Sequence, residues 1–475
     1  MSRLTAPLRS GALARRLGLG DATAIVISNV IGAGILTTPA LVAGLAPRPS
    51  AMLAAWGVGG VLAWAGATAY AELAARYPRV GGEYVYIREA FGPLAAFLTG
   101  WTSFIAGFSG AIAANAVAAA ILASRLVPAN AARSIALPWP ADWVMVRIPT
   151  ESLIAVAVIL ALSLIHSLGL TVGRLVQNSL AVAKVVGLTL VAVAGVWIGR
   201  GPTAAPAAPG GTVGGWLLAL IPVMFSYSGW NAATYVAEEV RHPRRNVPRA
   251  LWAGTAVVVA LYLMINLAYL CVSPSERAAT INVAEPIARQ VLGPAAATVV
   301  TLLTILILLS STSAMVLAGP RVYFAMAQDG LFFSAAARVH PRFRTPAVAI
   351  FLQGACSAVL ALTGTFERLV TYTGFAVVLF SGVAAAALIV LRRRAPCPSP
   401  GWRPRRLAPA IFVAAAAAIT TNALYVAPKQ VALGAMVIAA GVPIYWTMRR
   451  THHATRADQG GHDESLALNR RSAHS

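Results

Sequence analysis

The sequence contains few charged residues and few cysteines. Only 11% of its 475 residues are charged, whereas soluble domains are about one-quarter charged. Hydrophobic residues make up 58% of the chain, more than a water-soluble fold of this length can hide. The three cysteines, Cys271, Cys356 and Cys397, form neither a close pair nor a metal-binding spacing. These absences argue against a disulfide-stabilised soluble domain and favour a protein embedded in lipid.

Sequence motifs of enzymes are also missing. The chain has no phosphate-binding loop of the kind that ATP-driven machines use. It has no His and Glu set inside an apolar run that would bind a metal ion, and no paired nucleophile and base. We therefore predict that the protein is not an enzyme and has no cofactor. Transport driven by a gradient, or by exchange, is the activity that remains.

Long apolar runs recur along the whole chain. A run of 18 or more apolar residues can cross about 30 Å of hydrocarbon as an α-helix, at ~1.5 Å per residue. The pattern predicts an all-α integral membrane protein with about twelve transmembrane helices. We expect these spans near residues 20–45, 51–74, 94–124, 151–169, 174–198, 213–240, 250–272, 294–327, 346–363, 367–391, 407–426 and 430–449.

The net charge of +22 would suit a nucleic-acid-binding protein, but the basic residues lie in short clusters between the apolar runs. With the N-terminus inside, 27 of the 37 basic residues fall in cytoplasmic segments and nine in external segments, and Lys184 lies within a span. Such a bias is typical of an inner, or plasma, membrane protein. It predicts cytoplasmic tails at 1–19 and 450–475, the second of them disordered, and no nucleic-acid partner.

Two of the expected spans are interrupted at corresponding places. The first contains Gly32-Ala33-Gly34 and then Pro39, and the sixth contains small residues over 226–229. Main-chain groups freed at membrane depth need a ligand or a cavity, and a zwitterionic amino acid offers both a carboxylate and an ammonium. The matched breaks predict inverted five-helix repeats over 20–198 and 213–391. A close helix-packing contact is the alternative explanation for the glycines.

Lys184 lies near the middle of the fifth span. A charge there costs at least ~2.5–3.5 kcal/mol, so the side chain should face a cavity or carbonyl oxygens. Its ammonium, or a change in its protonation, would then take the place of a coupling cation. The alternative is a lysine that extends to a membrane interface.

Other polar residues carry weaker predictions. Asn29 and Asn115 are expected to form hydrogen bonds between helices, and the hydroxyls of residues 310–313 could coordinate a small cation. Glu238 and Glu239 are expected to pair with the arginines of residues 241–249. The stretch 77–93 mixes charges with aromatic residues and is predicted to lie at the membrane interface.

Several stretches resemble the amino acid–polyamine–organocation superfamily, in particular amino-acid permeases similar to the L-type exchangers and their bacterial relatives. The resemblance covers about residues 17–449, and it implies a LeuT-type fold with two additional helices over 407–449. The stretches that carry it are Ser28-Asn-Val-Ile-Gly-Ala-Gly-Ile-Leu, Gly81-Gly-Glu-Tyr-Val-Tyr-Ile-Arg-Glu-Ala-Phe-Gly, Phe225-Ser-Tyr-Ser-Gly-Trp-Asn, Glu238-Glu-Val-Arg-His-Pro-Arg-Arg-Asn-Val-Pro-Arg-Ala and Arg321-Val-Tyr-Phe-Ala-Met-Ala-Gln-Asp-Gly.

The resemblance also implies roles for single residues. It implies that N–H groups of Ala33 and Gly34 hold the substrate carboxylate, and that Lys184 replaces a sodium ion. Many members have serine where this chain has Ala33, so one hydroxyl is missing here. Carbonyls of Val30, Phe225 and Ser228 would accept from the substrate ammonium, and Phe225, Trp230 and Asn231 would line the pocket or gate. The substrate-binding set is Val30, Gly32, Ala33, Gly34, Phe225, Ser226, Ser228, Gly229, Trp230 and Asn231.

The substrate class follows from the placement of the acidic residues. A cationic substrate needs a carboxylate in its pocket, and no Asp or Glu lies near the middle of a span. We therefore predict small to medium neutral amino acids, with cationic amino acids or polyamines as the alternative substrate. Proton symport is preferred over exchange. A membrane sensor and a passive channel are the other classes considered. The loop 125–150 has no cysteine, so no disulfide-linked heavy chain is expected.

Overall fold

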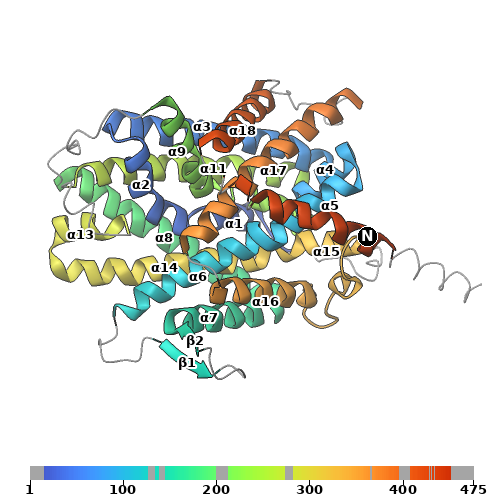
Figure 1. The fold of residues 1–475 in the computed structure, drawn as a ribbon, viewed down its shortest axis with the longest axis horizontal. Helices are drawn as coiled ribbons and strands as arrows, with labels where there is room; N and C mark the ends of the chain where they lie inside the picture. The colour runs from blue at the N-terminus through green and yellow to red at the C-terminus, as the bar shows by residue number, and fades with distance from the viewer. Residues whose placement is uncertain are drawn as a thin grey trace, which may run out of the picture.

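In a computed structural model of the chain, the structure describes residues 15–126, 134–138, 145–198, 212–272, 282–363, 366–394, 407–426, 428, 431–432 and 434–450. Nearly all of both predicted tails, 1–19 and 450–475, lies outside the described residues. The described chain is a bundle of helices, as Figure 1 shows. The helical architecture predicted from the apolar runs is therefore confirmed.

The first half of the chain forms helices that begin or end at glycine and proline. Pro49 and Pro93 each occupy the first helical turn, where a missing N–H costs no hydrogen bond. The elements are α1 Leu19–Val30, α2 Ala33–Leu45, α3 Pro49–Arg76, α4 Glu83–Phe91, α5 Pro93–Thr102, the π-helix Ser103–Phe108, α6 Ser109–Ser124, α7 Thr150–Ser167 and α8 Leu170–Ile198.

The second half follows the same pattern. Its elements are α9 Val213–Tyr227, α10 Ala232–Tyr235, the 3-10 turn Ala237–Glu239, α11 Pro243–Leu270, α13 Ala284–Leu292, α14 Pro294–Ala318, α15 Pro320–Gln328, the 3-10 turn Ser334–Ala337, α16 Ala347–Thr363, α17 Phe366–Arg394 and α18 Leu407–Val426. Residues 434–450 are also helical. Large aromatic side chains such as Trp56, Tyr70 and Tyr262 are buried where these helices meet.

One β-hairpin interrupts the all-helical pattern. Strands β1 Ser134–Pro138 and β2 Met145–Pro149 pair antiparallel, with Ser134 opposite Pro149. In Figure 1 the hairpin lies outside the bundle, next to α7. β-branched and apolar residues such as Ile135 and Ile148 favour an extended backbone here, and the rest of the described architecture is helical, as predicted.

Seven described helices are long and apolar enough to cross a membrane, and the bent pair α1–α2 would make an eighth. Helices α9 and α16 are apolar but have only 15 and 17 residues. The third expected span, 94–124, is a helix that runs from Pro93 to Ser124 and contains the π-helical stretch in its middle. Such stretches often mark functional positions because they shift the side chains that follow.

Helix α4 lies within the stretch 77–93, which we predict to lie at the membrane interface, and most of its side chains are buried against the bundle. Glu83, Tyr84 and Tyr86 are buried, and the helix packs against α5 and α17. Gly81 and Gly82 have φ angles of +110° and +54°, and this left-handed turn directs the chain back into the bundle. The polar groups find partners inside: the Tyr84 hydroxyl donates to Asp329 over 2.8 Å.

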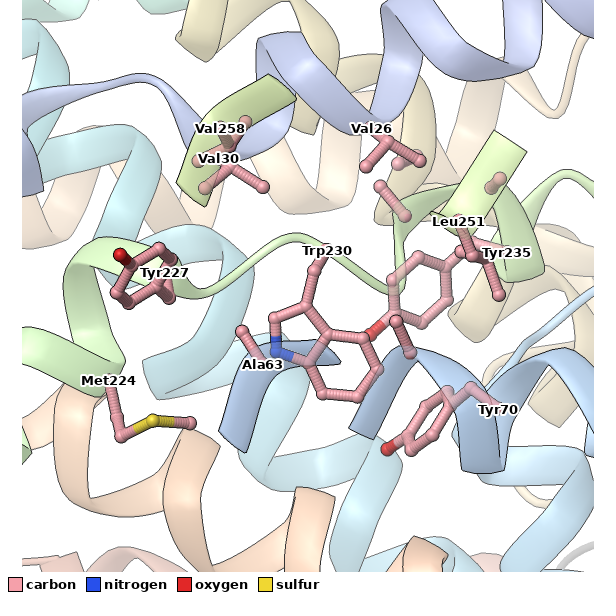
Figure 2. Close-up of a cluster of buried hydrophobic side chains, with 14 of the residues drawn as sticks. Val26, Val30, Ala63, Tyr70, Met224, Tyr227, Trp230, Tyr235, Leu251 and Val258 are labelled. Atoms are coloured by element: carbon pink, nitrogen blue, oxygen red, sulfur yellow. The ribbon is translucent and has the colours of Figure 1, made fainter. Parts of the chain in front are cut away.

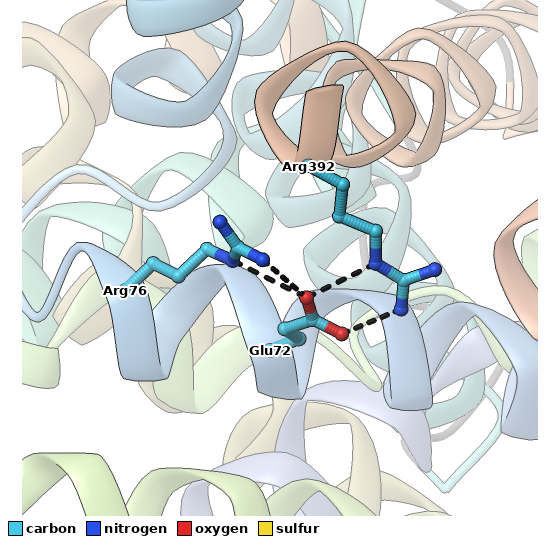
Figure 3. Close-up of polar contacts among 3 residues, drawn as sticks. All are labelled: Glu72, Arg76 and Arg392. Carbon is cyan, nitrogen blue, oxygen red and sulfur yellow. Dashed lines mark hydrogen bonds and ion pairs between the residues drawn. The ribbon is translucent and has the colours of Figure 1, made fainter. Parts of the chain in front are cut away.

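Two buried acidic groups join distant helices through arginine. Figure 3 shows Glu72 of α3 between Arg76 and Arg392, with Arg392 Nη2 lying 2.5 Å from Glu72 Oε2. Glu239 accepts from Arg321 of α15, with 2.9 Å between Oε1 and Nε. The predicted partners of Glu239, the arginines of residues 241–249, were wrong. Within the described residues those arginines form no ion pair with it.

Breaking the Arg321–Glu239 pair is expected to lower the thermal stability of the purified protein. Both side chains are 2% exposed, so Arg321→Met leaves an uncompensated buried carboxylate at a cost of about 3–5 kcal/mol. The double variant Arg321→Met with Glu239→Leu should recover most of the loss, because no charge is left unpaired. Glu89→Gln, which breaks the exposed pair with Arg79, should cost less than ~1 kcal/mol. Equal melting temperatures for Arg321→Met and Glu89→Gln would contradict this.

Candidate functional site

Both predicted helix interruptions are present. Helix α1 ends at Val30, α2 begins at Ala33, and the two axes differ by 40°. Gly32 between them has no room for a side chain, because a Cβ there would lie 2.6 Å from Ser311 Oγ. The Gly32-Ala33-Gly34 motif is therefore both a chain break and a close packing contact.

The second interruption follows α9. The helix ends at Tyr227, and residues 228–231 lead to the short α10. Gly229 has a φ of +100°, a backbone conformation that costs other residues roughly 1–2 kcal/mol. Sequence and structure agree at this position, because glycine alone adopts this conformation without strain.

The two interruptions lie directly against each other. A Cβ on Gly229 would lie 2.8 Å from the carbonyl carbon of Asn29, and a Cβ on Gly34 would lie 2.6 Å from Ser226 Cα. The hydroxyls of Thr38 and Ser226 are hydrogen-bonded over 2.6 Å. Residues separated by nearly 200 positions in the sequence thus form one site.

Protein groups satisfy several main-chain atoms that the breaks set free. The Tyr262 hydroxyl of α11 lies 2.8 Å from the Val30 carbonyl oxygen and 3.0 Å from that of Ser226. The Phe225 carbonyl accepts from the N–H of Ser228. The N–H of Ala33, which the family resemblance assigns to a substrate carboxylate, donates instead to Asn115 Oδ1 over 2.8 Å.

Asn115 is the interhelical hydrogen-bonding residue that we expected, and Asn29 is not. Asn115 connects Ala33 to Ser311 of α14, to which its Nδ2 donates over 3.1 Å. Asn29 Nδ2 donates to Ile25 of its own helix. The predicted cation-binding hydroxyls of residues 310–313 are partly engaged, since Thr312 donates to Leu308 and Ser313 lies 2.7 Å from His166 Nε2.

Lys184 of α8 reaches the first interruption. Its ammonium donates to the carbonyls of Ser28 and Ile31, over 3.2 and 3.1 Å. The side chain is 1% exposed, so it does not extend out of the bundle. Within the described residues no carboxylate lies within ion-pair distance, and carbonyl oxygens are its partners. An ammonium bound by the carbonyls of a helix break occupies the kind of position that a metal cation would take.

A cavity of about 70 Å³ lies beside the interruptions, with room for several water molecules. Helix-break residues form one wall, and residues of the π-helical span, α14 and α17 form the others. We call it the central cavity. Its lining residues are Asn29, Glu83, Thr102, Ser103, Gly107, Phe108, Ala111, Ser228, Gly229, Asn231, Tyr235, Met315, Val377, Phe380 and Ser381.

Two predicted pocket residues lie elsewhere. Trp230 packs against Tyr70 and Phe412, with ring centroids 4.8 and 5.8 Å apart, as part of the buried cluster in Figure 2. Neither Trp230 nor Phe225 is among the described residues that line the central cavity. Of the expected substrate-binding set, the cavity lining contains Ser228, Gly229 and Asn231.

A carboxyl group that the sequence reasoning missed lies in the central cavity. Glu83 lies between the expected spans 51–74 and 94–124, outside every long apolar run. The prediction of a neutral substrate rests on the absence of Asp and Glu near the middle of any span, and Glu83 adds a carboxyl to the cavity lining that this argument did not consider. The Gly81-Gly82 turn immediately before Glu83 is the signal that could have identified it, since it directs α4 into the bundle.

Comparisons with known proteins cover nearly the whole chain. Residues 17–448 match the model of a family described as "Amino acid permease". The chain is 30% identical to the b(0,+)-type amino acid transporter 1 of Oryctolagus cuniculus, over 81% of this chain and 77% of the relative. It is 28% identical to the large neutral amino acids transporter small subunit 2 of Rattus norvegicus, over 92% and 81%. It is 26% identical to the serine/threonine exchanger SteT of Bacillus subtilis (strain 168), over 92% and 98%.

These similarities extend over both helix interruptions, Lys184 and the central cavity. The family and these relatives are transporters and not enzymes, which confirms that prediction. Apolar helices long enough to cross a membrane agree with a multi-pass membrane location. The chain therefore belongs to the amino acid permease family.

Proposed function

We propose that the protein is a sodium-independent secondary permease that carries small to medium neutral amino acids by alternating access. The direct contact between the two helix interruptions, beside the central cavity, is the observation that supports this most strongly. Main-chain groups at such a junction can bind both charged ends of a zwitterion. Proton symport is preferred over exchange as the mode of coupling.

Substrate binding would replace bonds that the protein makes with itself. A substrate carboxylate would displace Asn115 from the N–H of Ala33, at the positive end of α2. The ammonium would bind carbonyls of the breaks, with Val30, Phe225 and Ser228 as candidates. Asn115 is buried and hydrogen-bonded to Ser311, so it would keep the N–H of Ala33 paired until a substrate carboxylate binds.

Sodium independence rests on Lys184. Its ammonium already donates to the carbonyls of Ser28 and Ile31, so these oxygens do not need a sodium ion as a partner. We propose that the Lys184 ammonium takes the place of a coupling cation and stabilises the first interruption.

The proposed architecture is the LeuT type, with inverted repeats at 20–198 and 213–391 and two further helices at 407–449. The positions of the interruptions in the first and sixth expected spans support it. Twelve spans and cytoplasmic termini in the inner membrane belong to the same proposal. In it, the first two helices of each repeat rock against the remaining helices.

The names of two relatives support a neutral substrate, since one is a large neutral amino acids transporter and another a serine/threonine exchanger. The carboxyl of Glu83 favours a second candidate, a carrier of cationic amino acids, because it lies in the central cavity. We propose no disulfide-linked heavy chain and no nucleic-acid partner.

Counterflow in liposomes tests the proposed function. Purified protein in vesicles loaded with unlabelled amino acid should take up the same labelled amino acid, without sodium, across a panel of twenty. We expect alanine, serine and leucine to exchange well and arginine poorly. Uptake of arginine but not of alanine, serine or leucine would contradict the neutral class, and a strict need for sodium would contradict the role of Lys184.

A further inference from the structure

The carboxyl of Glu83 is a buried acid for which the described residues provide no cationic partner. Its side chain lies in the lining of the central cavity, and the residue is 6% exposed. Among the described residues, no Lys, Arg or His nitrogen lies within ion-pair distance of it. The other buried acids, Glu72 and Glu239, both contact arginine. A carboxylate left alone at such a depth is costly, so Glu83 needs a bound cation or a proton.

The hydrogen bonds of Glu83 only partly satisfy a charged carboxylate. The Tyr70 hydroxyl donates to Oε2 over 2.8 Å, whereas Asn231 Nδ2 and Ser103 Oγ lie 3.4 Å from Oε2 and Oε1. Among the described residues, the titratable groups that interact with it are tyrosines of α3, α10, α4 and α15, and none of them is a base. These are Tyr70, Tyr235, Tyr86 and Tyr323.

Burial raises the pKa of the Glu83 carboxyl, and the hydrogen bonds from Tyr70, Tyr235 and Ser103 offset only part of that increase. Because its pKa is raised, the Glu83 carboxyl stays protonated up to a higher pH than the carboxyl of an exposed glutamate does. Protonation therefore removes the one uncompensated charge in the described wall of the central cavity.

We propose that Glu83 is the residue that carries the coupled proton through the transport cycle. When the cavity is open to one side, the carboxylate takes a proton from water. The acid stays neutral while the cavity closes around the substrate and then opens to the other side. The proton returns to water on the other side, so one proton moves with each substrate and no further reactant is needed. This inference rests on the proposed function, and it names the residue that performs the coupling.

The position of Glu83 connects protonation to the substrate site. Asn231, which contacts the carboxyl, belongs to the second interruption, and it also donates to the Tyr235 hydroxyl over 2.9 Å. Loss of the proton would strengthen the pull of the carboxylate on Asn231 and so shift the chain that follows Gly229. Among the described residues, the lining of the central cavity includes Glu83 and does not include Lys184.

Glu83→Gln tests the inference, because glutamine imitates the protonated acid and cannot release a proton. In liposomes with an acidic exterior, the wild type should accumulate alanine, and Glu83→Gln should fall to the passive level. Counterflow by the variant should persist at a measurable rate, because exchange needs no net proton movement. Glu89→Gln is the matched control, since this acid on the same helix is partly exposed and lies 3.5 Å from Arg79. It should accumulate alanine as the wild type does.

Tyr70→Phe provides a second variant that keeps the carboxyl. Losing the one short hydrogen bond disfavours the charged carboxylate, so the pH at which proton-driven uptake is half-maximal should rise by about one unit. An unshifted pH profile in this variant would contradict the inference even if Glu83→Gln failed to fold.

The outcomes separate this inference from the proposed function. Wild-type protein that exchanges alanine but does not accumulate it under a pH gradient overturns the proton inference and leaves the permease. Accumulation by Glu83→Gln at the wild-type level also overturns it. The same holds if the wild type carries lysine and Glu83→Gln loses lysine alone, because the carboxylate would then bind a cationic substrate. Absence of counterflow with every amino acid overturns the proposed function itself.

Discussion

Replacing Lys184 with alanine is expected to abolish amino-acid uptake. The variant removes the only hydrogen-bond donor shown to reach both Ser28 and Ile31 carbonyls in the described structure. Each buried acceptor left unsatisfied costs about 1–3 kcal/mol, so the first interruption should lose its geometry and the uptake rate should fall more than tenfold. Initial rates of counterflow in liposomes, at equal amounts of inserted protein, measure the effect.

Two control variants distinguish the lost ammonium from the lost volume. Lys184→Met keeps the length of the side chain and should be as inactive as Lys184→Ala. Leu188→Ala opens a space one turn further along α8, where Leu188 is 1% exposed, and should still transport. Methylammonium in the buffer should partly restore Lys184→Ala, because it can occupy the vacated position. Wild-type rates for Lys184→Ala across the pH range of the assay would remove Lys184 from the mechanism.

Gly34→Ala is expected to have the second large effect. The new Cβ would lie 2.6 Å from Ser226 Cα, a backbone atom that cannot rotate away, so α2 and α9 must separate. A displacement of about 1 Å at a binding site can lower the rate of transport by a factor on the order of a hundred. The hydrogen bond between Thr38 and Ser226 should weaken for the same reason.

Gly44→Ala is the matched control for this variant. Gly44 lies in the same helix, and a Cβ there would have nothing within 4 Å. Alanine favours the helical conformation over glycine by roughly 0.5–1 kcal/mol, so Gly44→Ala should be active and at least as thermally stable as the wild type. Comparable counterflow rates for the two variants would show that the contact between the interruptions does not matter for transport.

Gly34→Ala and Lys184→Ala both change features that can be predicted from sequence. For the glycines this is possible because their effect on the backbone depends on the residue itself. Gly32, Gly34 and Gly229 interrupt apolar runs, and a residue without Cβ is required both for the φ of +100° at Gly229 and for the close approach at Gly34. The burial of Lys184 could also be predicted, because a single charge within a long apolar run must find an internal partner. The sequence predicts only the kind of partner for Lys184, carbonyl oxygens or a cavity, and not which residues provide it.

The features that were missed are those that depend on how helices pack. The helical membrane architecture and the places where helices break could be predicted from sequence, because apolar length and backbone freedom are properties of neighbouring residues. Three features depend on the packing of the helices: Glu83 lies in the central cavity, Asn115 accepts from the N–H of Ala33, and Arg321 is the partner of Glu239. These contacts join residues from 82 to 148 positions apart, and no local pattern specifies which helix faces meet.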